Sequence, residues 1–406
     1  MKKWKLDILS ILLVAFSGSL GFSLVLLSLI VLTTKFGGNS VVYGFLASIY
    51  PAFQFIGSIV LGRMSDVRGR RPILLISMVC GLGAWIFFVI TFFLPVTTLV
   101  TIHSEIFGTF VVTLPLLILM ISRAIEGFTA GNVSVAQAYI ADITSENQRR
   151  KNYGTLSIAS NLGFIIGPAL AGLLSLSVVG ERLPVFVAIG LAIITLYILF
   201  HHLPESLTKK QRQQSDKQKV HTLLQKVSIK FILTMFFLVY FAFNIFYTAL
   251  PLYALQELNW NITKLGIYFS FVALMMALVQ GPVMSYFAKR YTDSQLIKIG
   301  SGILAIGFLM FISPVEYIII IAALFFALGN GLMWPSLISY LSKQAGEEFQ
   351  GIAQGLSGSA GSLASVIGLI TGGFLFDKLA GYAFIVPAFV ILSVFMTSVF
   401  YLRKNL

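Results

Sequence analysis

The sequence has little charge, one cysteine and few histidines. Charged residues make up 11% of its 406 residues, whereas about a quarter is usual in a soluble domain. The single cysteine, Cys80, lies within an apolar run, which excludes a disulfide framework and a Cys/His metal pattern. The four histidines lack metalloenzyme spacing, and no Ser/His or paired-carboxylate constellation accompanies them. We therefore expect neither an enzyme nor a bound metal or cofactor.

Apolar residues are abundant instead, at 57% of the chain with a mean hydropathy of +0.92. They come in blocks of twenty or more, and a bilayer core of about 30 Å needs about twenty apolar residues per helix. The first block follows the basic residues of "MKKWKLDILSILLVAF", as in a signal peptide, but it continues to about Leu32 without a small-residue cleavage site. We therefore predict an all-α integral membrane protein whose first span is retained.

The hydropathy pattern predicts twelve transmembrane helices. They cover residues 8–33, 42–62, 73–94, 114–141, 154–178, 184–202, 228–252, 263–287, 296–313, 317–341, 351–376 and 382–402. No repeated pore-lining filter accompanies them, which argues against a channel.

The basic residues predict the orientation of these spans. If the N-terminus is cytoplasmic, 21 of the 28 Lys and Arg residues lie on the cytoplasmic side and four on the opposite side. This bias follows the positive-inside rule. It places both termini in the cytoplasm of a multi-pass protein of the cell (cytoplasmic or inner) membrane. It also accounts for the net charge of +13, so we expect no nucleic-acid partner.

A long polar stretch divides the chain into two halves. "PESLTKKQRQQSDKQKVHTLLQK" lies between spans six and seven, so we predict a six-helix bundle at 1–202, a cytoplasmic linker at 203–227 and a second bundle at 228–406. The halves echo each other at an offset of 201 residues, pairing Tyr139 with Tyr340, Glu146 with Glu347, Gly154 with Gly355, Gly167 with Gly368 and Gly172 with Gly373.

The loop between spans two and three, "GRMSDVRGRRP" at 62–72, is unusually charged. Gly62 would allow close helix approach, and Gly69 would permit a tight turn. Asp66, the only anion among four arginines that include the pair Arg70 and Arg71, can cap a helix N-terminus or hold an arginine. Alternatively, these arginines only fix the topology.

This loop resembles the major facilitator superfamily signature G-x-L-x-D-R-x-G-R-R. It departs at Met64, which replaces Leu, and at Val67, because the first arginine comes one residue late. Two related six-helix bundles joined by a cytoplasmic loop are also the layout of these transporters. In that family the loop latches the two bundles on the cytoplasmic side, so the resemblance implies a gating role here.

Span five, "GTLSIASNLGFIIGPALAG", resembles the motif of drug:proton antiporters. The matching residues are Gly154, Gly163, Gly167, Pro168 and Gly172, with Ala171 in place of a final glycine. Gly163 and Gly167 share one helix face and allow close packing, while Pro168 removes a backbone hydrogen bond and favours a kink. Glycine and proline are common in membrane helices generally, so the link to export rests on the resemblance.

Span four carries a charged pair within the membrane. Arg123 and Glu126 are three residues apart and share a face with Gly127, Ala130, Ser134 and Gln137. A polar face is costly against lipid, so it should line a cavity or another helix. The segment resembles the family motif R-x-x-Q-G, with Glu126 in place of Gln. Glu126 takes up and releases the coupling proton in one hypothesis; in the other, the two residues form a permanent salt bridge.

Further polar and aromatic residues fall near the middle of their spans, where a substrate would bind. They are Tyr50, Gln54, Asn161, Tyr240, Asn244, Tyr247, Gln280, Asn330 and Trp334. Each could equally form an interhelical hydrogen bond or an interfacial contact.

The whole chain resembles twelve-span drug exporters of the tetracycline-resistance kind. The resemblance implies a monomeric secondary active transporter, driven by the proton gradient without a cofactor, that exports small amphipathic compounds by alternating access. Its partners would be the substrate, protons and the lipid bilayer. The alternatives are a transporter for a metabolite such as a sugar, amino acid or siderophore, and a transport-inactive receptor or scramblase on the same scaffold.

Overall fold

The computed structural model describes residues 2–105, 107–144, 146–206, 223–346 and 349–401. Side chains at 2–7, 146–151, 153–154, 157, 161, 165, 181 and 350–351 fall outside this description. The chain forms two compact units, Met1–Gln214 with Ile262–Ile267, and Ser215–Asn261 with Tyr268–Leu406. Each is described by itself below.

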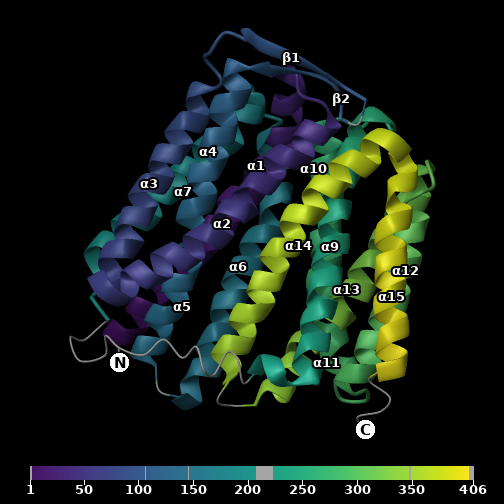
Figure 1. Cartoon of the computed structure of the whole chain (residues 1–406). Helices are drawn as coiled ribbons and strands as arrows, with labels where there is room; N and C mark the ends of the chain where they lie inside the picture. Colours follow the sequence, from purple (N-terminus) through teal and green to yellow (C-terminus); the bar gives the residue numbers. More distant parts are fainter. Residues whose placement is uncertain (1, 106, 145, 207–222, 347–348, 402–406) are drawn as a thin grey trace. The chain divides into compact units, whose positions relative to one another are not determined.

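The first unit consists of long apolar helices (Figure 1). They are α1 (Lys2–Lys35), α2 (Ser40–Arg68), α3 (Arg70–Ile90), α4 (Leu114–Ala130), α5 (Asn132–Ile143), α6 (Glu146–Leu174) and α7 (Leu183–His202), with a short 3₁₀ turn, η1 (Gly180–Arg182). The side chain of Asn39 caps α2 by accepting from the amide of Val42 at 3.0 Å. Helices α4 and α5 make up one predicted span that is divided at Gly131.

The core of this unit is formed by apolar side chains from six of its helices. It contains Ile11, Val14, Ala15, Leu61, Ile73, Leu74, Val135, Ala136, Tyr139, Ile140, Leu156, Leu199 and Leu203. Tyr139 is fully buried, and its hydroxyl donates to the carbonyl of Pro204 at 3.0 Å. The one polar group of this side chain is therefore satisfied, as a buried hydroxyl requires.

A β-hairpin joins α3 to α4 and is not among the predicted elements. Strands β1 (Thr98–Ser104) and β2 (Gly108–Thr113) pair antiparallel, from Thr98 opposite Thr113 to Ser104 opposite Gly108. The β-branched residues threonine, valine and isoleucine make up most of β1, and threonine and valine most of β2; these residues favour extended backbone. The hairpin contacts the turn between α1 and α2, where Asn39 donates to the carbonyl of Phe107 at 2.7 Å.

The second unit is also helical. Its elements are α9 (Val227–Gln256), α10 (Ile262–Leu278), α11 (Met284–Phe287), α12 (Asp293–Met310), α13 (Glu316–Ala345), α14 (Gln350–Leu379) and α15 (Ile385–Tyr401), with the 3₁₀ turn η4 (Ala380–Phe384). The start of α10, Ile262–Ile267, is grouped with the first unit. A π-helical segment, η2 (Val279–Val283), joins α10 to α11 and contains Pro282. Phe246, Phe308 and Phe326 form the centre of its core, with ring centroids 4.7–5.8 Å apart.

The pattern of helix contacts repeats between the units. In the first, α1 packs on α6 and α7, α3 on α4 and α7, and α2 on α4. In the second, α9 packs on α14 and α15, α12 on α13 and α15, and α13 on η2. Each of these helix contacts in the first unit thus has a counterpart in the second unit, between the membrane segments that hold the same places in the chain order.

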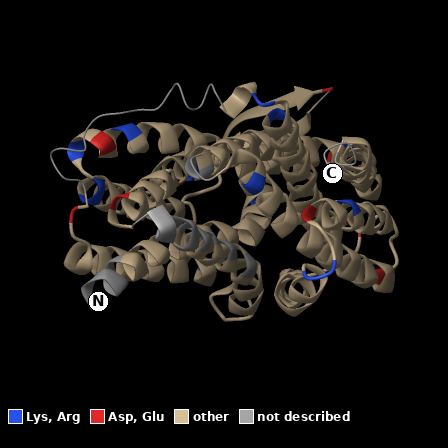
Figure 2. Cartoon of the chain, turned by 90° about the horizontal axis from the view of Figure 1, so that it is seen from below, with Lys and Arg blue, Asp and Glu red and all other residues tan. Residues whose placement is uncertain are grey.

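The helices are long and apolar enough to cross a bilayer. Ten segments of the described chain meet this criterion, and one of them, Ile352–Tyr401, contains both α14 and α15. A shorter apolar stretch, Ile158–Leu174, lies within α6. Charged residues are sparse along the ribbon (Figure 2). The predicted all-α membrane fold with about twelve spans is confirmed.

Candidate functional site

The centre of the candidate site is an ion pair on α4. Nη1 of Arg123 donates to Oε2 of Glu126, one helical turn away on the same face. Arg123 has no exposed surface and Glu126 is 6% exposed. Burying one charge alone is costly, and pairing offsets much of that cost, which is why the two residues occur together in an apolar span.

Aromatic rings from two neighbouring helices surround the guanidinium of Arg123. Its carbon lies 5.0 Å from the ring centroid of Tyr50 on α2 and 5.5 Å from that of Phe22 on α1. The two rings contact each other at 4.3 Å. Cation–π contacts of this kind stabilise a desolvated guanidinium. Phe22 was not predicted, because a phenylalanine in an apolar span has no distinguishing signal.

Two donors of Arg123 are left over. Nε and Nη2 are buried and have no hydrogen-bond partner within the described part of the chain. A guanidinium has five N–H donors in a fixed plane, and Nε and Nη2 carry three of them. Most of the hydrogen-bonding capacity of Arg123 is therefore not used by the bond to Glu126.

Glycines bring α2 and α4 into backbone contact around the ion pair. A Cβ at Gly127 would lie 2.4 Å from the carbonyl oxygen of Tyr50, and one at Gly57 would lie 2.0 Å from that of Phe128. A Cβ at Gly131 would meet the backbone of Gly57. The predicted close approach at Gly62 is wrong, because a Cβ there would be in ordinary contact with Ser134 at 3.4 Å. The close contact lies nearer the ion pair.

The rest of the predicted polar face of span four is divided between α4 and α5. Ser134 is half-buried and donates to the carbonyl of Ser58 on α2 at 2.8 Å, so it joins helices. Gln137 is exposed. Gln54, predicted on α2, is half-buried. Asn161 lies on α6, and its side chain is outside the described residues.

The charged loop forms a compact network at one end of the first unit. Arg70 is buried at the first position of α3, where Nη1 lies 2.5 Å from Asp66 Oδ1 and Nε lies 3.1 Å from Asp142 Oδ2. Nη1 also donates to Ser65 Oγ at 2.6 Å. Arg70 thus joins the end of α2, the start of α3 and the end of α5. Asp142 was not predicted as part of this site.

Glu205 caps the start of α3. Its Oε1 accepts from the amide of Arg70 at 2.9 Å, and its Oε2 accepts from the amide of Arg71 at 3.2 Å. A carboxylate is stabilised at a helix N-terminus, where the first amides lack intrahelical partners. Gly69 has φ 106°, a region that favours glycine, and a Cβ there would lie 2.5 Å from Glu205 Oε2. Asp66 therefore holds Arg70, while Glu205 provides the cap.

The glycines of the antiporter-like motif lie on α6, where they contact α1. A Cβ at Gly163 would meet the carbonyl oxygen of Phe16 at 2.6 Å, and one at Gly167 would meet Ser23 Oγ at 1.8 Å. Ser23 donates to the carbonyl of Gly163 at 2.9 Å. Pro168 follows within α6.

Two motif glycines lie beyond this contact. Gly172 is in backbone contact with Gly266, which is grouped with the same unit. The packing of Gly154 lies outside the described residues.

The second unit contains a cluster of predicted residues around Tyr240. Its ring lies 5.0 Å from that of Trp334, at a right angle to it, and a Cβ at Gly361 of α14 would lie 2.7 Å from the Tyr240 ring. Asn244 donates to the carbonyl of Tyr240 at 2.7 Å and to Ser365 Oγ at 2.9 Å, so it joins α9 to α14. Tyr247 contacts Phe269 at 6.3 Å.

Asn330 and Gln280 lie farther along this unit. Asn330 is buried, and its Oδ1 has no hydrogen-bond partner within the described chain. Its Nδ2 contacts the sulfur of Met276 at 3.9 Å. Gln280 is half-buried in the π-helical segment η2, beside Gly331. No three His, Cys, Asp or Glu side chains of the described residues gather where they could hold a metal.

Comparisons with known proteins agree with this architecture. The family model described as Major Facilitator Superfamily matches residues 11–368 and 232–405. The chain is 26% identical to the tetracycline resistance protein, class H, of Pasteurella multocida, over 98% of this chain and 97% of that protein. It is 27% identical to multidrug resistance protein 1 of Bacillus subtilis, over 95% of this chain and 93% of that protein. It is 28% identical to the quinolone resistance protein NorA of Staphylococcus aureus, over 88% and 87%.

Solved structures share the fold. The E. coli xylose transporter XylE in a partially occluded inward-open conformation superposes with a TM-score of 0.75, at 15% identity, over 99% of this chain and 98% of that one. The human organic anion transporter MFSD10 superposes with a TM-score of 0.68, at 20% identity, over 97% and 99%. The chain therefore belongs to the Major Facilitator Superfamily, and it is a multi-pass membrane transporter rather than an enzyme.

Proposed function

We propose that this transporter is a proton-coupled exporter of small amphipathic compounds that works by alternating access. Relatives named for resistance to tetracycline, to multiple drugs and to quinolones align along 88–98% of the chain. The observation that carries the coupling part of the proposal is the buried pair of Arg123 and Glu126 on α4.

Glu126 is the proposed proton carrier. In the structure its carboxylate is paired with Arg123 and shielded from water. When the carboxylate takes up a proton, it loses most of its attraction for the guanidinium, and Arg123 is then held mainly by the rings of Phe22 and Tyr50. Protonation therefore changes how α4 is held to α1 and α2, which is the kind of change that couples a proton to a conformational step.

The substrate site is proposed to be apolar, with few polar anchors. In the first unit the rings of Tyr50 and Phe22 surround Arg123, and in the second unit Tyr240 packs against Trp334; each cluster is a candidate apolar contact for an amphipathic molecule. The spare donors of Arg123 offer hydrogen bonds to an acceptor on the substrate or to water. Binding sites that combine apolar walls with a few polar groups are typical of small-molecule pockets.

The network of Asp66, Arg70, Asp142 and Glu205 is proposed to act as the cytoplasmic gate. It joins the ends of α2, α3 and α5 and the segment after α7, so that these ends move as one body. The proposal includes both termini in the cytoplasm, insertion in the cytoplasmic membrane and action as a monomer. It rests on the distribution of Lys and Arg residues and on the relatives.

Transport in inside-out vesicles with an imposed pH gradient tests the proposal. Tetracycline, a fluoroquinolone and a lipophilic cation serve as probes. Gradient-driven accumulation of a probe by the wild type, and only downhill exchange by Glu126→Gln, is the expected result. Glu105→Gln, the same chemical change at an exposed residue of the hairpin, is the matched control. Full proton coupling in Glu126→Gln would show that the pair of Arg123 and Glu126 serves the wild type only as a structural salt bridge.

A further inference from the structure

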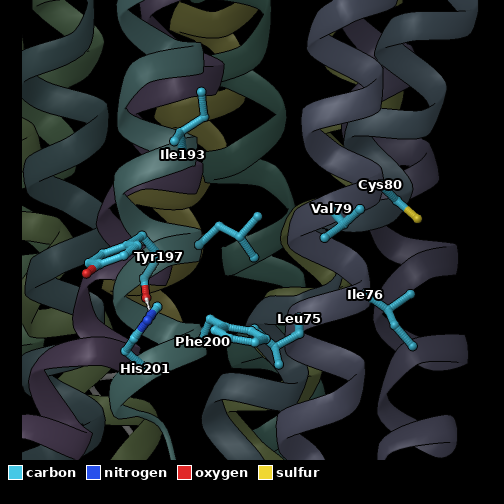
Figure 3. A pocket seen from close by; sticks show the side chains of 9 residues that line it. Leu75, Ile76, Val79, Cys80, Ile193, Tyr197, Phe200 and His201 are labelled. Atoms are coloured by element: carbon cyan, nitrogen blue, oxygen red, sulfur yellow. Dashed lines mark hydrogen bonds between the residues drawn. The ribbon is translucent and has the colours of Figure 1, made fainter.

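A groove of about 530 Å³ lies between α3 and α7 of the first unit. Its lining includes Leu75, Ile76 and Val79 of α3 and Ile193, Phe200 and His201 of α7. Figure 3 shows Val79 and Leu75 of α3 directed toward α7, and Phe200 of α7 directed toward α3 at one end. Its walls are hydrocarbon and aromatic rings, so its chemistry suits an acyl chain.

The groove is open along its length. Ile193, Tyr197 and Phe200 are 53–62% exposed on α7, and Ile76 and Val79 are exposed on α3. Both helices belong to apolar segments long enough to cross the bilayer, so this surface faces hydrocarbon. From Ile193 to His201 the groove runs for about 12 Å at about 1.5 Å per residue. One leaflet provides about 15 Å of hydrocarbon, so the groove extends through most of one leaflet.

A fixed cation lies at one end of the groove. Nη2 of Arg71 donates to the carbonyl of Phe200 at 2.9 Å, and the guanidinium lies 5.9 Å from the centroid of the Phe200 ring. Phe200 therefore both lines the groove and holds Arg71. His201 lies beside Phe200: its ring is 4.3 Å from the ring of Tyr197 and 5.3 Å from the ring of Phe200.

The charge of Arg71 is not neutralised within the described chain. No carboxylate oxygen of the described residues lies within ion-pair distance of its guanidinium. Glu205 accepts from the backbone amide of Arg71 and not from its side chain. The other nearby arginine, Arg70, is paired with Asp66 and Asp142. Arg63 and Arg68 of the same loop also have no ion pair within the described residues, but Arg71 is the one held at the groove by Phe200, so it is the cation placed to meet an anion there.

We propose that the groove between α3 and α7 binds one anionic phospholipid of the leaflet that borders the charged loop. An acyl chain lies between Val79 and Ile193, and the phosphate is paired with Arg71 beside His201. The acyl chain of the lipid contributes little selectivity, because the surrounding lipid is as apolar as the groove. The headgroup contributes the selectivity, because basic pockets at the membrane surface attract anionic lipids and a guanidinium binds phosphate through two parallel hydrogen bonds.

Native mass spectrometry of the purified full chain tests this proposal. The protein in detergent is titrated with dioleoyl phosphatidylglycerol or dioleoyl phosphatidylcholine, which share acyl chains and differ in net charge. We expect the first bound phosphatidylglycerol to be retained about fivefold more strongly than phosphatidylcholine, the effect of one cation near the lipid surface. Equal retention of the two lipids by the wild type would overturn the proposal without any variant.

Three variants locate the site. Arg71→Gln should lower the ratio of phosphatidylglycerol to phosphatidylcholine retention to about one. Arg71→Lys should retain part of this preference, since the charge remains without the paired hydrogen-bond geometry. Val79→Trp fills the groove and should remove the tightly held lipid. Ile86→Trp is the matched control, because Ile86 is 60% exposed on α3 but does not line the groove. An unchanged preference in both Arg71→Gln and Val79→Trp would show that the lipids bind as a general annulus.

Discussion

Asp142 and Lys343 occupy equivalent places in the two units and form ion pairs of opposite polarity. Oδ2 of Asp142 lies 3.1 Å from Nε of Arg70, at the first residue of α3. Nζ of Lys343 lies 2.6 Å from Oδ2 of Asp293, at the first residue of α12. The offset of 201 residues that relates the repeats also relates Asp142 to Lys343. Each unit thus joins its fourth membrane segment to the start of its third membrane segment, and the acidic and basic partners are exchanged between the two units.

The two ion pairs should differ in strength. Side chains in the pair of Asp142 and Arg70 are 16% and 9% exposed, whereas Lys343 is 69% exposed. We expect Asp142→Asn to lower the free energy of unfolding by about 2 kcal/mol, since Asp66 still contacts Arg70. Lys343→Gln should lower the free energy of unfolding by only about 0–1 kcal/mol. Thermal unfolding in detergent at low and high salt measures both, and equal losses would contradict the difference in burial.

Glu126→Gln should impair both coupling and stability. The substitution leaves the cation of Arg123 buried without its counter-ion, at a cost on the order of 3–5 kcal/mol. The double variant Arg123→Gln with Glu126→Gln removes both charges and should unfold at a higher temperature than the single variant. Proton-driven transport should be absent from both. Equal stability of the single and double variants would mean that water or lipid headgroups already compensate Arg123.

Gly167→Ala should disrupt the contact between α6 and α1. The added Cβ would overlap with Ser23 Oγ and approach the amide of Leu24, which belongs to the backbone and moves only with the helix. Overpacking of this kind costs about 1–3 kcal/mol. Gly190→Ala on α7 is the control, because nothing lies within 4 Å of its Cβ position. Thermal unfolding of the two variants compares them, and a similar effect at both positions would argue against close packing at Gly167.

Removal of the cap on α3 should weaken the charged loop without affecting the ion pair of Arg123. Glu205→Ala leaves the amides of Arg70 and Arg71 without their acceptor, and the loss of a cap costs about 1 kcal/mol. Glu105→Ala on the hairpin is the control. Hydrogen exchange of the first turn of α3 provides a local measurement. Unchanged exchange in Glu205→Ala would show that the cap contributes nothing to order there.

Gly69→Ala tests the backbone conformation of the same turn. The positive φ of Gly69 disfavours any other residue, and the new Cβ would also displace Glu205. We expect a loss on the order of 1–2 kcal/mol in thermal unfolding. Gly83→Ala on α3 has open space and should be neutral or slightly stabilising. A loss at Gly83 as large as that at Gly69 would contradict the role of the turn.

Features set by local sequence were predictable. The spans follow from runs of apolar residues, and the pairing of Arg123 with Glu126 follows from their spacing on one helix. The hairpin had a usable signal in the β-branched residues around His103, and the π-helical segment had one in Pro282. These two signals compete with strong hydropathy, which dominates a membrane sequence.

Contacts between distant residues were not predictable. Asp142 reaches Arg70 across 72 positions, and Glu205 reaches it across 135 positions. Glu205 also falls within the predicted linker, where an acid beside many basic residues has no distinguishing pattern. The same holds for Gly57, which is one of many glycines in the spans and becomes important only because Phe128 lies against it.

The division of span four at Gly131 separates the two charged groups that the proposed cycle uses. Arg123 and Glu126 belong to α4, and Asp142 belongs to α5, so the two charged groups lie on separate helices. Gly131 lies between the two helices, and a Cβ there would overlap with the backbone of Gly57, so span four is packed directly against α2 at this point. If Glu126 carries the coupling proton, as proposed, we expect a tilt of α4 to reach α5 as a change in the angle between these two helices beside α2.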